Sequence, residues 1–148
     1  MAKPQSTKYD DVDWHVGGDF PDDLDAQAAR THIGLFLAWA IERGLESELL
    51  RDGSAGPLAE LRAGRIKGSQ VLEQCCDDKL TNDDLSELGN AFAADYYEKD
   101  YLDDYVDLSD DDLPTIYHEP DNAEKYEQVR DMLDARLSAW KRRKGLAS

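Results

Sequence analysis

Three histidines, His15, His32 and His118, are the side chains of this sequence with the widest chemical range. Imidazoles with nearby carboxylates bind zinc or iron, or act as general bases. No two of them have the i, i+4 spacing of a helical pair, so a site would have to be assembled from distant segments. His32 alone is more simply explained as a hydrogen-bonded core histidine. A site built from the three histidines and a loop acid such as Asp19 is therefore the second of two functional hypotheses, a metal- or small-ligand-binding protein with or without catalytic activity.

The segment that begins at Tyr9 combines acidic and aromatic side chains in a way that helix capping does not explain. Its candidate partner-binding residues are Tyr9, Asp10, Asp11, Asp13, Trp14, His15 and Asp19. Charge steers a cationic partner to such a surface and aromatic rings anchor it. The alternative is that the rings pack into the core and the acids are solvated. No helical period is present, so we expect an ordered loop over residues 9–21.

The remaining sequence offers little catalytic chemistry. It contains no glycine-rich phosphate loop, no G-x-S-x-G and no kinase motif set. The adjacent Cys75 and Cys76 are expected to be reduced and partly buried, with acidic neighbours that oppose thiolate formation. Three Asp-Asp-Leu sequences are better explained by helix capping than by metal binding. We therefore predict no catalytic residue, no metal ligand and no cofactor, and favour a non-enzymatic protein.

The elements that must position these residues are helices gathered around one apolar segment, Ile33 to Ile41. It is too short to span a bilayer and is apolar on every side, which is typical of a buried central helix at roughly 31–43. Gly34 would let another backbone approach closely. Helical patterns are expected at 22–43, 46–51, 58–63, 70–77, from 81 or 82 onward with a kink near 99–100, and from 121 to the end. The predicted fold class is all-α, a single compact domain of about six helices with ordered aromatic loops.

Composition limits the partners. The chain has 33 Asp and Glu against 17 Lys and Arg, a net charge of −16. This charge repels phosphate backbones and anionic lipid, which argues against nucleic-acid and membrane partners. The N-terminus lacks the apolar region of a secretory signal, so we expect a cytoplasmic protein. We predict a disordered lead at 1–8, one α-helical domain at 9–144 and a tail at 145–148.

Several blocks of the sequence are specific enough to compare with known families. The first two are Tyr9-Asp10-Asp11, Trp14-His15 and Gly17-Gly18-Asp19-Phe20-Pro21, followed by Thr31-His32-Ile33-Gly34 and Phe36-Leu37-Ala38-Trp39. Together with later blocks they resemble an uncharacterised family of small acidic bacterial proteins that carry a domain of unknown function. The resemblance covers nearly everything from Tyr9 to Trp140. It implies a bacterial cytoplasmic protein with a shared α-helical fold, and it supplies no activity to transfer.

The leading functional hypothesis is a non-enzymatic acidic binding protein. Its most concrete version is an immunity-type inhibitor of a basic protein such as a nuclease toxin. A strongly negative domain would imitate a nucleic-acid backbone or complement a cationic cleft, and salt would weaken the association. The oligomeric state is left open by the sequence.

Overall fold

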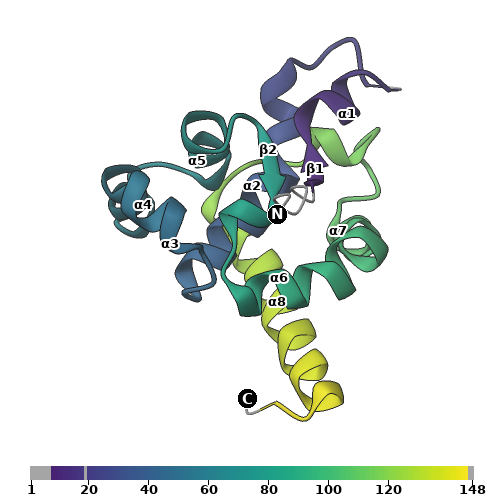
Figure 1. The fold of residues 1–148 in the computed structure, drawn as a ribbon. Helices are drawn as coiled ribbons and strands as arrows, with labels where there is room; N and C mark the ends of the chain where they lie inside the picture. The colour runs from purple at the N-terminus through teal and green to yellow at the C-terminus, as the bar shows by residue number, and fades with distance from the viewer. Residues whose placement is uncertain (1–7, 19, 147–148) are drawn as a thin grey trace.

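The computed structural model describes residues 8–18 and 20–146, most of which are helical (Figure 1). In chain order the elements are β1 (Lys8–Asp11), α1 (Val12–Val16), α2 (Ala26–Glu42), α3 (Glu48–Gly53), α4 (Ala55–Arg62), α5 (Gly68–Cys75), β2 (Lys79–Thr81), α6 (Glu87–Tyr96), α7 (Leu102–Leu108) and α8 (Ala123–Lys144). Two 3₁₀ turns lie at Asn82–Asp84 and Ile116–His118, and a π-helical turn, Tyr97–Tyr101, joins α6 to α7. The all-α prediction is confirmed, with one small sheet added to it.

Helix α2 is the buried centre of the fold, as predicted. Its N-cap is Asp25, whose carboxylate accepts a hydrogen bond from the backbone N–H of Gln27 at 3.0 Å. Every residue from Thr31 to Ile41 is buried, and Trp39 is fully so. Because this stretch is apolar on all sides, other elements must cover it all round, and their apolar faces form the core.

Helix α5 packs directly against α2 at Gly34, where the two backbones touch. A Cβ atom on Gly34 would lie 2.3 Å from the backbone nitrogen of Ser69, and one on Gly68 would lie 1.9 Å from the carbonyl oxygen of Gly34. Side chains at either position would force the helices apart. The expectation that Gly34 admits a second backbone is therefore confirmed.

The aromatic segment predicted as a loop begins instead as a strand and a short helix. β1 pairs antiparallel with β2, with Asp10 opposite Leu80, and α1 follows directly from its N-cap Asp11. A strand this short, paired with a distant segment, leaves no alternation long enough to detect in the sequence. Lys8, which falls in the predicted disordered lead, opens β1. Residues 1–7 of that lead lie outside the described residues.

Helix starts shift by a few residues from the prediction where another side chain provides the cap. Ser86 caps α6, in place of Thr81 or Asn82, and Asn122 caps α8 in place of Asp121. Asn and Ser accept the free N–H groups of a first turn as readily as Asp, so the sequence leaves the choice open. The predicted kink near 99–100 falls within the π-helical turn. The C-terminal half of α8 extends away from the other elements (Figure 1).

We predict that Gly34→Ala lowers the free energy of unfolding by roughly 3 kcal/mol, the upper end of the usual cost of overpacking. The added methyl group meets the backbone of α5, which cannot move as a flexible side chain would. Urea denaturation followed by circular dichroism measures the change.

The matched control is Gly56→Ala in α4, where a Cβ atom would have nothing within 4 Å. This substitution should be neutral or stabilise by about 0.5–1 kcal/mol, because alanine loses less conformational entropy than glycine in a helix. Equal effects at both positions would show that the α2–α5 contact is not close-packed.

Candidate metal centre

The junction of β1 and α1 brings Asp10 and His15 together. Asp11 ends the strand and caps the helix, its carboxylate accepting a hydrogen bond from the Asp13 N–H at 2.9 Å. The chain therefore turns sharply between the two side chains. His15 Nε2 lies 2.7 Å from Asp10 Oδ1, and both residues are largely buried.

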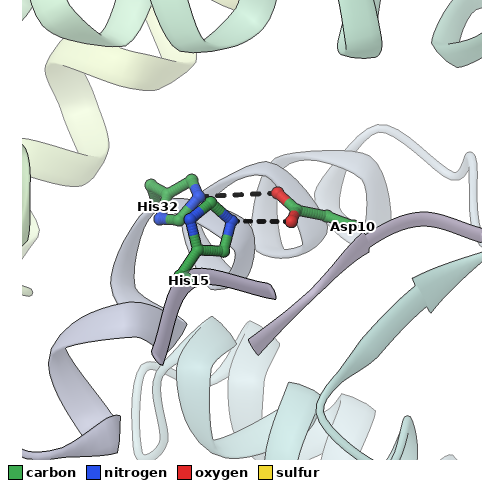
Figure 2. A group of neighbouring side chains, drawn as sticks. All are labelled: Asp10, His15 and His32. Carbon is green, nitrogen blue, oxygen red and sulfur yellow. Dashed lines mark hydrogen bonds and ion pairs between the residues drawn. The ribbon is translucent and has the colours of Figure 1, made fainter. Parts of the chain in front are cut away.

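A second imidazole, from α2, points at the same carboxylate. The His32 side chain is 2% exposed, and its Nε2 lies 3.4 Å from Asp10 Oδ2. The two imidazole rings meet edge-on, with centroids 4.5 Å apart. Figure 2 shows both rings directed at the two oxygens of Asp10. Among the described residues, His32 Nε2 has no hydrogen-bond partner of acceptable geometry, so a buried polar atom here is left unsatisfied.

Asp10, His15 and His32 form a set of metal-ligand type. One ligand atom from each lies within 4.8 Å of the other two. Two imidazole nitrogens and one carboxylate oxygen are donors that suit zinc and non-haem iron. The three residues come from β1, α1 and α2 respectively, so no local spacing in the sequence predicts that they meet.

Hydroxyl and amide groups hold these side chains in position. Tyr97 donates to Asp10 Oδ2 at 2.6 Å, and the Asp11 N–H donates to Asp10 Oδ1 at 2.9 Å. The hydroxyl of Tyr117 lies 2.8 Å from His15 Nδ1. Tyr101 donates to the backbone carbonyl of His32. Contacts of this kind fix the tautomer and orientation of imidazole ligands in metal sites.

The set lines a cavity of about 230 Å³. Its other walls are Tyr9, Trp14, Tyr97, Glu98, Tyr101 and Leu102. The side chain of His15 keeps 15% of its surface exposed, whereas that of His32 keeps only 2%. A small molecule or water entering the cavity would therefore meet His15 first, and the buried His32 imidazole lies behind it.

The electrostatics of the set favour an anionic Asp10 and a neutral His32. Burial alone would raise the pKa of Asp10, but its hydrogen bond to His15 and the adjacent His32 imidazole hold that pKa well below the ordinary value of 3.8. Burial lowers the pKa of His32 below 6.5 and outweighs the opposing effect of Asp10. A deprotonated carboxylate and a neutral imidazole are the forms that bind a metal ion.

The third histidine lies outside the set. His118 Nε2 contacts Asp23 Oδ2 at 3.0 Å, and its Nδ1 contacts Thr115 Oγ1 at 2.9 Å. The expected convergence of all three histidines is therefore not found: only His15 and His32 meet at one carboxylate, that of Asp10. Asp19, the loop acid named with them, lies outside the described residues, and the carboxylate that lies between His15 and His32 is that of Asp10 in β1.

The predicted partner-binding residues divide between core and surface. Tyr9, Asp10 and Asp11 are buried and belong to a paired strand. Asp13 is exposed, and Trp14 is 53% exposed. No local signal in the sequence connects the distant hydroxyl groups of Tyr97 and Tyr117 to Asp10 or His15, which they contact in the structure.

The expectation of unreactive cysteines agrees with the structure. Cys75 and Cys76 are free thiols, and Cys76 is buried. Burial, together with Asp84, raises the pKa of Cys76. A thiol in this state is a poor nucleophile at neutral pH.

We predict that the free energy of unfolding falls as the pH decreases from about 7 to about 5. The pKa of His32 is lower in the folded chain than in the unfolded chain, where it is near 6.5. Between these two pKa values the unfolded chain binds a proton at His32 and the folded chain does not. The stability that the neutral His32 contributes is therefore present above pH 6.5 and is lost as the pH falls. Urea denaturation at a series of pH values measures the slope.

The variant His32→Gln should flatten this slope, even if it lowers stability at every pH, because the titrating group is gone. A slope that is unchanged in His32→Gln would contradict the assignment of the acid sensitivity to His32.

Comparison with known proteins assigns a family without assigning an activity. No curated protein and no solved structure matches the chain. Among the described residues, no helix is long and apolar enough to cross a membrane. One family model, described as a domain of unknown function (DUF7832), matches residues 8–119, a span that includes Asp10, His15 and His32. The chain therefore belongs to the DUF7832 family.

Proposed function

We propose that this protein binds a divalent transition-metal ion through Asp10, His15 and His32. The observation that carries the proposal is His32 Nε2, a buried nitrogen that points at Asp10 without a hydrogen bond among the described residues. An unsatisfied buried polar atom costs about 1–3 kcal/mol. A metal ion between the imidazoles and the carboxylate would give this nitrogen a partner.

The competing explanation is a purely structural network around Asp10. The hydrogen bonds from Tyr97, His15 and the Asp11 N–H already satisfy the carboxylate and tie three segments together. In a structural network the His32 imidazole would help to keep Asp10 anionic, but its buried Nε2 would remain without a hydrogen bond among the described residues. The position of His32 therefore favours a ligand role.

The donor set limits the identity of the ion. Mg²⁺ and Ca²⁺ prefer oxygen ligands, whereas imidazole suits Zn²⁺, Fe²⁺ and their neighbours. Structural zinc sites are usually closed by four protein ligands, and three-ligand sites keep a position for water or substrate. The cavity beside His15 supplies the space for such a position. An ion here would thus be accessible to small molecules.

We predict that protein purified in the presence of Zn²⁺ or Co²⁺ retains about one equivalent of metal per chain. His15→Ala and Asp10→Asn should each lose it, because each removes one of three ligands. Elemental analysis and isothermal titration with Co²⁺ measure stoichiometry and affinity.

The control is His118→Ala, which removes a histidine outside the set and should bind metal as the parent protein does. Circular dichroism establishes that each variant is folded. Metal bound equally by His118→Ala and His15→Ala, or no stoichiometric metal in the parent protein, would rule the centre out.

A second prediction concerns the orientation of His15. Tyr117→Phe removes the hydroxyl that contacts His15 Nδ1 and should weaken Zn²⁺ binding by about 10- to 100-fold, as the loss of such partners does in metal sites. The control is Tyr126→Phe, which removes a hydroxyl that contacts Glu42 instead. Competition with a chromogenic chelator measures the affinities. Equal affinities in the two variants would contradict the role of Tyr117.

The second candidate function is the acidic, non-enzymatic binding protein, with an immunity-type inhibitor of a basic nuclease as its concrete form. The specific observation that favours it is an exposed tryptophan, Trp14, beside acidic residues on a chain of net charge −16. A basic toxin encoded beside this chain and inhibited by it in a salt-sensitive complex would support this function. Purification from native cells without any basic protein would count against it.

A further inference from the structure

Three exposed apolar side chains lie on one face of the molecule. Trp14 of α1 is 53% exposed, and Leu102 and Val106 of α7 are 43% and 47% exposed. Trp14 and Leu102 line the same cavity, and Val106 lies one helical turn beyond Leu102 on the same side of α7. We call these three residues the Trp14 face. Exposed apolar groups gathered at a cavity mouth are typical of interaction sites.

Acidic side chains surround this face. Asp13 adjoins Trp14, Glu98 lines the cavity beside Leu102, and Asp103 follows Leu102 on α7; all three are exposed. Lysine occurs here as well: Lys8 Nζ lies 5.0 Å from the centre of the Trp14 ring and pairs with Asp11. One face of the Trp14 ring therefore already carries a cation from this chain, which shows that the ring suits cationic groups.

We propose that the Trp14 face is the docking surface for a basic protein, with Trp14 as the anchor. This inference rests on the second candidate function and gives it a location. Tryptophan at the centre of an interface contributes much of the binding energy, and an acidic surround steers a cationic partner into place.

The charge distribution decides between a basic partner and a second copy of this chain. A two-fold symmetric contact would place the same acidic residues opposite one another, on chains that each carry −16. Like charges across an interface cost several kcal/mol. A partner with a cationic surface instead gains from every one of these acids.

Docking here would also cover the cavity mouth, since Trp14 and Leu102 form part of its wall. The partner and the proposed metal ion would use separate groups, however. Trp14 and Leu102 provide apolar contact at the surface, whereas the His32 side chain is buried. The two proposals can therefore be tested independently.

The experiment is site-specific photo-crosslinking in cells that produce the protein natively. Benzoylphenylalanine replaces Trp14, Leu102 or, as a control of similar kind, Leu49, which is 70% exposed on α3. We expect adducts with one basic protein from positions 14 and 102, and none from position 49.

The crosslinked protein is then purified and its affinity for designed variants is measured. Trp14→Ala should weaken binding by about 30-fold, the effect of removing an interface anchor. Glu98→Lys should weaken binding of the partner several-fold more than the control Asp52→Lys does. The control makes the same change of charge on α3, away from the Trp14 face. His118→Ala, a change at a histidine outside the metal set that contacts Asp23, should leave the affinity unchanged within about twofold.

Adducts with a second copy of the chain, with an acidic protein, or equally from position 49 would overturn the Trp14 face as the docking surface, as would no adduct at all. A basic partner that crosslinks only elsewhere would overturn the location and leave the second candidate function standing. Equal affinities of Glu98→Lys and Asp52→Lys would overturn the role of the acidic surround.

Discussion

The structure around the cavity depends on one buried carboxylate, that of Asp10. An ion removed from water costs several kcal/mol unless its surroundings replace the lost hydration. Tyr97, the Asp11 N–H and His15 provide that replacement, and each comes from a different part of the local structure. The need to satisfy this single charge therefore joins the β1–α1 junction to the helical segment that carries Tyr97. A cation bound at the same carboxylate would strengthen the junction further, because it would compensate the charge directly.

The central helix serves packing and chemistry at once. Gly34 lets α5 approach, and His32, two residues earlier, directs its ring at Asp10. The π-helical turn adds the second element, since Tyr97 reaches Asp10 and Tyr101 reaches the backbone carbonyl of His32. Turns of this kind widen a helix locally and are frequent at functional sites. The widened turn thus lets two stacked tyrosines, with ring centres 4.9 Å apart, contact different residues of one cluster.

Local signals in the sequence were enough to predict the core and insufficient to predict the site. The apolar stretch Ile33 to Ile41 and the backbone approach at Gly34 follow from residue types within one helix, and both predictions are confirmed. The convergence of His32 with Asp10 depends on the pairing of β1 with β2 and on the packing of α1 against α2, which are long-range events. The sequence separates His32, at the start of the apolar helix, from His118, but only the fold shows that His15 joins His32 at Asp10 while His118 contacts Asp23.

The distribution of charge connects the two proposed sites. A chain of net charge −16 raises the local concentration of cations of every size, and a cavity with apolar walls concentrates that field at its mouth. A small divalent ion at the proposed centre would meet Asp10, which remains anionic because its pKa is low. A basic protein is too large to enter and can only meet the exposed Trp14, Leu102 and Glu98 at the entrance. The same field would therefore select by size, holding an ion inside and a cationic surface outside.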